Sequence, residues 1–131
     1  MKQFLFTIIA STVLSCNDQN NLMMEKQNEK KIGTIEVVVF KTKSAYSKEQ
    51  VIEAAKAVNP VVQEYDGFIG RKLAIGEDGT WTDIVYWTDL QTAEIAAKEV
   101  MKSTSCQKFF AMIEEEGMQF MHLDPVIDTE H

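Results

Sequence analysis

Four stretches of the chain are rich in β-branched and aromatic residues, and two longer stretches carry apolar residues at helical spacing. Residues 35–40, 68–75, 81–88 and 118–123 are typical of strands. Glu77-Asp78-Gly79 predicts a tight hairpin turn between the second and third strands, because Gly tolerates a positive φ. The first strand has two largely apolar faces and must therefore be covered on both sides.

The first helical stretch follows Ser47-Lys48-Glu49-Gln50, which has the form of a capping box. Pro60 must interrupt this helix near Asn59, because it removes a backbone donor and clashes with the preceding turn. The apolar face of this stretch consists of Val51, Ile52, Ala55, Val58 and Val62.

The second helical stretch is expected to begin at Asp89 as its cap and to cover residues 90–102. Ser105 is expected to cap a further helical piece that contains Phe109, Phe110 and Ile113, and Gly117 is expected to end it. The expected apolar stripe of residues 90–102 is Leu90, Ala93, Ala97, Val100 and Met101.

The order of the elements is β-α-β-β-α-β, which predicts an α+β fold of the ferredoxin-like type. Both helices then cover one face of a four-stranded antiparallel sheet. The uncovered face is expected to carry several of Val38, Phe40, Tyr86, Trp87 and Phe120. This apolar area is too large for a monomer to expose, so the pattern predicts a homodimer through the sheet face.

The N-terminal part differs sharply from the rest. Residues 1–15 have a basic start and an apolar run of about half a membrane thickness, as in a secretory signal peptide. The run ends in Val13-Leu14-Ser15-Cys16, which resembles the lipobox of bacterial lipoproteins, with Cys16 as the lipidated residue. An ordinary signal peptide that contains a Cys is the alternative. Lipidation implies a bacterial cell-envelope location, periplasmic or on the outer surface.

Residues 16–31 are rich in Asn, Gln and charge, and are interpreted as the lipidated Cys16 and a flexible tether. The folded domain is then expected over residues 32–126, with a tail over residues 127–131. Within a total of 131 residues, this leaves room for one domain.

Charge and cysteine content exclude several classes of function. The chain has 13 basic and 20 acidic residues and a net charge of -7, which argues against a nucleic-acid partner. Its 2 cysteines cannot form a disulfide framework or a Cys-rich zinc site, and Cys106 is interpreted as a small core residue. No spacing of residues indicates a metal site or a phosphate-binding loop.

The segment from Ile35 to about Met121 resembles the antibiotic-biosynthesis-monooxygenase-like group of dimeric α+β barrels. The resemblance rests on the strand of residues 35–40, the Tyr65-Asp66-Gly67-Phe68 turn, and the DIVYWTD sequence of residues 83–89. It implies the dimeric barrel fold, and for some members an oxygenase activity on aromatic substrates without a cofactor. Haem-degrading members use a His on the helix after the Trp. Residues 92–97 contain no His here, so haem degradation is not expected.

Polar side chains among apolar strand residues are the candidates for chemistry, because a charge that faces an apolar interior must be paired or functional. His122, Glu36 and Asp83 are the candidate catalytic residues, with His122 the strongest because imidazole titrates near neutral pH. Satisfied structural charges are the alternative. On strand two the candidate is Arg71 or Lys72, of which Arg71 is preferred. The expected pocket residues are Phe40, Tyr86, Trp87, Arg71 and Phe120.

Together these features favour a lipid-anchored oxygenase that needs no cofactor and acts on a small aromatic or quinol-like molecule. A non-catalytic binding or stress-response module on the same fold is the alternative. A purely structural dimerisation domain is a third possibility. An open cavity with inward-facing polar groups would favour the first two, whereas a cavity filled by Phe and Met side chains would favour the third.

Overall fold

The computed structural model describes residues 30–129. Its four-stranded sheet consists of β1 (Thr34–Phe40), β2 (Phe68–Ile75), β3 (Trp81–Trp87) and β4 (Gln119–Leu123). The strands are antiparallel and lie in the order β2-β3-β1-β4. The fold is therefore the α+β, ferredoxin-like arrangement that the order of elements predicts.

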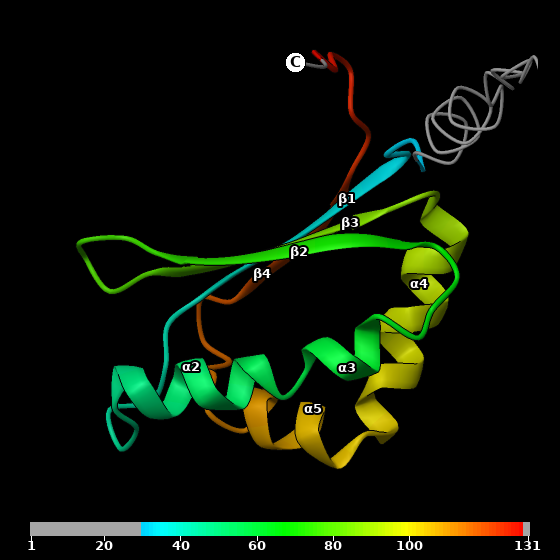
Figure 1. Cartoon of the computed structure of the whole chain (residues 1–131). Helices are drawn as coiled ribbons and strands as arrows, with labels where there is room; N and C mark the ends of the chain where they lie inside the picture. Colours follow the sequence, from blue (N-terminus) through cyan, green and yellow to red (C-terminus); the bar gives the residue numbers. More distant parts are fainter. Residues whose placement is uncertain (1–29, 130–131) are drawn as a thin grey trace, which may run out of the picture.

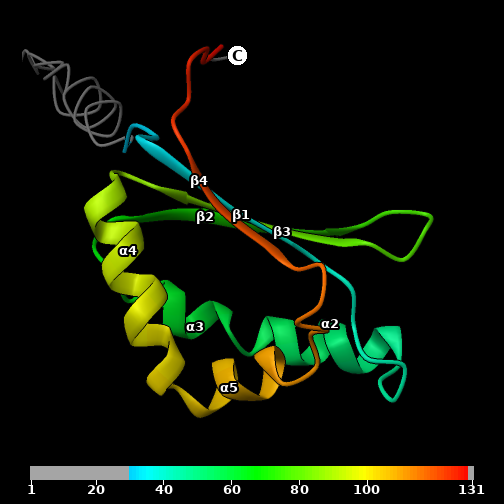
Figure 2. The same cartoon turned by 180° about the vertical axis from the view of Figure 1, so that it is seen from behind.

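All helices of residues 30–129 lie on one face of the sheet, and no element of this range covers the other face, called the uncovered face below (Figure 1 and Figure 2). The first connection contains α2 (Lys48–Lys56) and α3 (Asn59–Val62). The second contains α4 (Leu90–Glu99), the 3-10 turn η1 (Val100–Lys102) and α5 (Thr104–Phe110).

The first connection follows its sequence signals. Ser47 Oγ accepts a hydrogen bond from the backbone N–H of Gln50 at 3.2 Å, and Gln50 Oε1 accepts one from the backbone N–H of Ser47 at 2.8 Å. This is the expected capping box. The helix is interrupted after Lys56 and resumes at Asn59, with Pro60 in the first turn of α3, where its missing N–H costs nothing.

For the second helical connection, the predicted N-cap is confirmed, but the prediction for its later part is wrong. Asp89 caps α4, its Oδ1 accepting a hydrogen bond from the backbone N–H of Thr92 at 2.8 Å. The expected cap at Ser105 is wrong. The chain enters α5 through Ser103, whose backbone is extended and whose side chain makes no capping bond, so Ser105 lies inside the helix. The expected end of this helix at Gly117 is also wrong, because α5 ends at Phe110 and Ile113 forms a β-bridge with Thr42. Gly117, with a φ of 78°, lies instead at the turn into β4.

The prediction for the uncovered face is largely wrong. Of the five aromatic and apolar residues expected there, Tyr86 alone lies on that face, and Val38, Phe40, Trp87 and Phe120 face the helices. The apolar residues on the uncovered face include Ile35, Val37, Val39, Ile84, Tyr86 and Met121. The alternation of side chains was predicted correctly. Because both faces of β1 are apolar, the pattern could not tell which face the helices cover.

The main core lies between the sheet and α2 and α5. Phe40 stacks on Trp81 with ring centroids 6.4 Å apart, and the edge of Phe109 meets Phe40 at 5.9 Å. Cys106 is fully buried in this cluster, as its interpretation as a small core residue requires. A smaller cluster of Val85, Trp87, Ala93 and Ala96 joins β3 to α4.

Candidate functional site

A cavity of about 700 Å³ lies between the helix-covered face of the sheet and the second helical connection. This volume falls within the usual range for small-molecule sites. Side chains of the sheet and of both helical segments leave the space open rather than filling it. Most of the wall is apolar and consists of Val38, Val85, Trp87, Ala96, Ala97, Val100, Phe109, Phe110 and Ile113.

A row of charged or titratable side chains crosses the cavity, one from each strand of the sheet. His122 on β4 lies opposite Glu36 on β1 in the strand register. Asp83 on β3 is placed diagonally from Glu36, and Arg71 on β2 diagonally from Asp83. All four line the cavity. The antiparallel register therefore brings together residues from four separate segments of the sequence.

His122 and Glu36 form a hydrogen-bonded pair that can transfer a proton. Nε2 of His122 lies 2.8 Å from Oε2 of Glu36, and the two side chains are 17% and 11% exposed. Burial raises the pKa of the Glu36 carboxyl above its usual 4.5, the hydrogen bond and charge of His122 oppose this rise, and the nearby Asp83 carboxylate adds to it. A buried carboxyl with a raised pKa, hydrogen-bonded to an imidazole, is suited to general acid–base chemistry.

Arg71 and Asp83 form a second pair, held from several directions. Nε and Nη2 of Arg71 donate to the two carboxylate oxygens of Asp83 at 2.9 and 2.6 Å. Nη1 of Arg71 donates to the backbone carbonyl of Ala55 and to Oδ1 of Asn59, at 2.7 and 2.8 Å. The guanidinium also lies 5.6 Å from the centroid of the Phe109 ring. This network holds the Asp83 side chain in place beside Glu36.

Trp87 lines the cavity and carries a buried hydrogen-bond donor. The residue is 1% exposed, and Tyr65 and Phe68 pack against its ring edge-to-face at 6.4 and 5.8 Å. Its Nε1–H has no hydrogen-bond acceptor among residues 30–129. An unpaired buried N–H costs on the order of 1–3 kcal/mol, so an acceptor that reached this atom would recover that cost.

The rim of the cavity is partly apolar and partly charged. Met101, Met118 and Phe120 line it and are each about half exposed. Glu94, Lys98 and Glu115 also line the cavity, from α4 and the turn before β4. A ligand would therefore pass flexible apolar side chains before it reaches the His122–Glu36 pair.

Six of the eight predicted catalytic and pocket residues line this cavity: His122, Glu36, Asp83, Arg71, Trp87 and Phe120. The other two do not. Phe40 is 2% exposed and lies in the core against Trp81 and Phe109, because the aromatic cluster at that end of the sheet closes over it. Tyr86 points to the uncovered face, since it alternates with Trp87 along β3.

Sequence reasoning missed the helical half of the wall and Asn59. The small residues Ala96 and Ala97 leave room for the cavity on the side of α4. Their adjacent positions in an Ala-rich helix were a usable signal, because small side chains at a packed interface leave space. No pattern marked Asn59, whose contact with Arg71 depends on the break before Pro60.

Two further findings concern the described part of the chain. No group of three or more His, Cys, Asp or Glu side chains in residues 30–129 is arranged to hold a metal ion. Within the same range, no helix is long and apolar enough to cross a membrane. The predicted signal peptide of residues 1–15, the lipidation site Cys16 and most of the predicted tether lie outside the described residues.

The fold and the cavity between its sheet and helices define a ferredoxin-like α+β protein with a ligand-sized internal site. No protein-family model and no curated protein matches the chain. Solved structures do match. The cofactor-independent oxygenase SnoaB of Streptomyces nogalater aligns with a TM-score of 0.64 at 12% identity, over 77% of this chain and 100% of its own.

Two other solved structures have the same fold. The ActVA-Orf6 monooxygenase of Streptomyces coelicolor, in complex with nanaomycin D, aligns with a TM-score of 0.60 at 16% identity, over 76% of this chain and 93% of its own. A possible oxidoreductase of Bacteroides thetaiotaomicron aligns with a TM-score of 0.51 at 15% identity, over 72% and 99%. These identities establish a shared fold.

Proposed function

We propose that this chain is an antibiotic-biosynthesis-monooxygenase-like protein that oxidises a small phenol or quinol with molecular oxygen and without a cofactor. The observation that carries the proposal is the His122–Glu36 pair, with 2.8 Å between Nε2 and Oε2, at a cavity of about 700 Å³ with mainly apolar walls. The shared fold with a cofactor-independent oxygenase and a monooxygenase supports it.

The arrangement provides what such a reaction needs from the protein. The apolar walls bind the flat ring, and the His122–Glu36 pair takes the proton from the ring hydroxyl, which makes the ring a better electron donor to oxygen. The N–H of Trp87 stabilises the negative oxygen left on the ring. For a phenol the balance is phenol plus O₂ giving quinone plus water, with one oxygen atom transferred to the ring and the other released in water.

Oxygen consumption with a panel of phenols and hydroquinones tests the activity. We expect the wild type to consume oxygen in the presence of a chelator, and His122→Gln and Glu36→Gln to lose about 100-fold or more, the usual contribution of a general base. Glu64→Gln is the matched control, since Glu64 is exposed and does not line the cavity. Equal activity of all four proteins would remove the pair from the mechanism.

Ligand binding without turnover is the second candidate, and the same pair favours it, since His122 and Glu36 already satisfy each other's hydrogen-bonding needs. Anaerobic binding of a hydroquinone to the wild type, together with no oxygen uptake in air, would establish this function instead. A protein that neither binds nor oxidises any member of the panel would contradict both candidates.

We also propose that two copies pair through the uncovered sheet face. The six residues Ile35, Val37, Val39, Ile84, Tyr86 and Met121 make this face apolar, and no helix of the described chain covers it. Apolar faces of this kind are typical of interfaces rather than of free surface.

Membrane anchoring through Cys16 is the third part of the proposal, and it rests on the Val13-Leu14-Ser15-Cys16 sequence. Intact mass of the protein from the membrane fraction should show a diacyl- or triacyl-glyceryl group on Cys16. Cys16→Ala should move the protein out of that fraction, because two or three acyl chains are needed for stable anchoring. An unmodified Cys16 in membrane-associated protein would contradict the anchor.

A further inference from the structure

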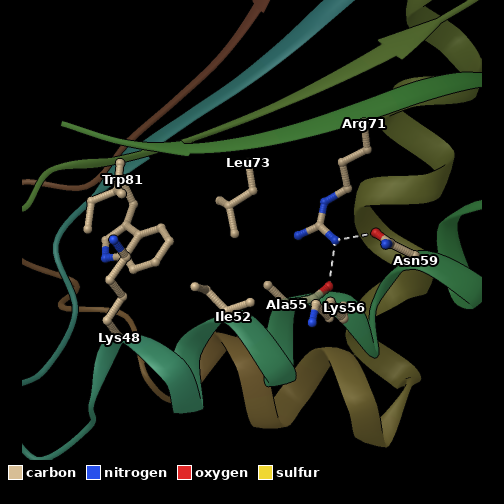
Figure 3. A pocket seen from close by; sticks show the side chains of 9 residues that line it. Lys48, Ile52, Ala55, Lys56, Asn59, Arg71, Leu73 and Trp81 are labelled. Carbon is tan, nitrogen blue, oxygen red and sulfur yellow. Dashed lines mark hydrogen bonds between the residues drawn. The ribbon is translucent and has the colours of Figure 1, made fainter.

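A second, smaller cavity lies between α2 and the strands β2 and β3, on the same side of the sheet (Figure 3). Its volume is about 290 Å³, at the lower end of the range for small-molecule sites. Arg71 is the one residue that lines both this cavity and the large one, so its side chain separates the two.

The floor of the second cavity is apolar. Figure 3 shows Trp81 at one end, Arg71 at the other, and Leu73 and Ile52 facing each other between them. Ile75 also lines the cavity and is 37% exposed, so part of this apolar surface is open to water. A flat apolar group placed against Trp81 and Leu73 would remove that surface from water.

The charges around this cavity are all of one sign. Lys48, Lys56 and Arg71 line it, and no carboxylate does, although the chain has 20 acidic residues against 13 basic ones. Two of these cations are already paired: Arg71 with Asp83, and Lys56 with Glu53 at 2.7 Å. Lys48 makes no ion pair or side-chain hydrogen bond with another residue of the range 30–129.

We propose that this cavity binds a small molecule with a flat apolar body and a single carboxylate. The body lies on the floor of Trp81, Leu73 and Ile52, and the carboxylate pairs with the ammonium of Lys48, which extends from the first turn of α2 beside Trp81 (Figure 3). One unpaired cation matches one negative charge.

A doubly charged phosphate fits this cavity less well. Phosphate recognition favours a free guanidinium that donates two hydrogen bonds. Arg71 already donates four hydrogen bonds, two to Asp83, one to Ala55 and one to Asn59.

The two tryptophans of the chain allow a test in which each cavity has its own reporter, since Trp81 lines the small cavity and Trp87 the large one. Benzoate is titrated into the ¹⁵N-labelled full chain, and the two indole N–H signals are followed after assignment with Trp81→Phe. We expect the Trp81 signal to shift and saturate with a dissociation constant of roughly 1 mM, an ordinary affinity for so small a ligand, while the Trp87 signal stays in place.

Variants then identify the charge that is recognised. Lys48→Gln should weaken benzoate binding about fivefold, as expected for a partly exposed ion pair. Lys72→Gln is the matched control, because Lys72 lies on β2 but on the uncovered face of the sheet and loses the same charge. Benzyl alcohol, which lacks the carboxylate, should bind the wild type more weakly than benzoate does.

Three outcomes would overturn the proposal. The Trp81 signal fails to shift, or it shifts together with Trp87, which would place benzoate in the large cavity. The third is an equal effect of Lys48→Gln and Lys72→Gln, which would mean that the overall charge of the protein governs binding. None of these outcomes bears on oxygen consumption in the large cavity, so the proposed oxidation stands or falls separately.

Discussion

His122 and Glu36 lie directly opposite each other on β4 and β1, with Nε2 of the histidine 2.8 Å from Oε2 of the glutamate. They are 86 positions apart in the sequence, and the antiparallel register alone brings them together. The pair is mostly buried and forms one end of a polar row that continues through Asp83 to Arg71. Arg71 and Asp83 neutralise each other, which leaves Glu36 and His122 as the members of the row that can exchange a proton.

The raised pKa of Glu36 predicts a pH dependence of stability. Its unfolded-state pKa is near 4.5 and its folded-state pKa is higher, so the folded protein holds more protons between these two values. The free energy of unfolding therefore falls as the pH rises through this window. Glu36→Gln does not titrate, so its stability relative to the wild type should rise as the pH is raised above 4.5, until Glu36 is ionised in the folded wild type as well.

Urea unfolding at several pH values measures this effect. Glu64→Gln is the control, because Glu64 is exposed and makes no side-chain hydrogen bond or ion pair within the described range. The comparison is repeated in a His122→Gln background, in which the imidazole that contacts Glu36 is absent. A stability difference between Glu36→Gln and wild type that stays flat with pH would contradict the raised pKa.

The buried Arg71–Asp83 ion pair predicts that substitutions at its two residues have strongly non-additive effects on the free energy of unfolding. Their side chains are 7% and 11% exposed, and removal of one partner leaves a buried charge unpaired. Asp83→Ala should lower the free energy of unfolding by about 3–5 kcal/mol, whereas Arg71→Met/Asp83→Leu should recover most of this loss. Lys56→Ala, which breaks the exposed pair with Glu53, should cost less than about 1 kcal/mol.

Denaturant unfolding of the four proteins gives these values directly. A double variant as unstable as Asp83→Ala would contradict this prediction, because removal of the unpaired charge would then recover no more than the lost bonds of Arg71 to Ala55 and Asn59 cost. If Asp83→Ala costs no more than Lys56→Ala, the pair is open to water in solution.

The sequence pattern predicts the helices and strands well, but it does not predict which face of the sheet the helices cover. The strands, the interruption before Pro60 and the cap at Asp89 follow from local signals, and each is confirmed. Whether Val38 or Val37 faces the helices is not a local property, because both faces of β1 are apolar and the choice depends on the path of the whole chain.

The candidate site was also predictable only in part, because its residues have local signals but their pairing does not. Polar residues within apolar strands stand out in the sequence, which is how Glu36, Asp83 and His122 were found. Their pairing was not predictable, because it requires the register between β1 and β4. Phe40 is among the expected pocket residues, yet its contacts with Trp81 and Phe109 place it in the core.

Trp87→Phe separates a ligand contact from a packing role. Phe keeps an aromatic ring against Tyr65 and Phe68 but removes the unpaired N–H. The smaller ring volume of Phe destabilises the folded protein, whereas the removal of an unpaired buried N–H stabilises it. The free energy of unfolding should therefore change by less than about 1.5 kcal/mol. Anaerobic affinity for a hydroquinone should fall about tenfold, the value of one hydrogen bond.

Trp81→Phe is the matched control for this experiment, since Trp81 lines the small cavity and not the large one. Calorimetry of hydroquinone binding should give the same affinity for Trp81→Phe as for the wild type. An unchanged affinity in Trp87→Phe would mean that the indole N–H does not contact the ligand.

Ile84→Lys tests the proposed dimer through the sheet. Ile84 lies near the middle of β3 on the uncovered face, where its neighbours across the strands are Val37 and Lys72. A second lysine beside Lys72, facing a partner's apolar surface, would leave a charge buried without a counterion, at a cost of several kcal/mol. Light scattering should give a dimer mass for the wild type and a monomer mass for Ile84→Lys.

Ile95→Lys is the control: it makes the same change on the half-exposed Ile95 of α4 and should remain dimeric. A monomeric wild type, or a dimeric Ile84→Lys variant, would contradict pairing through this face.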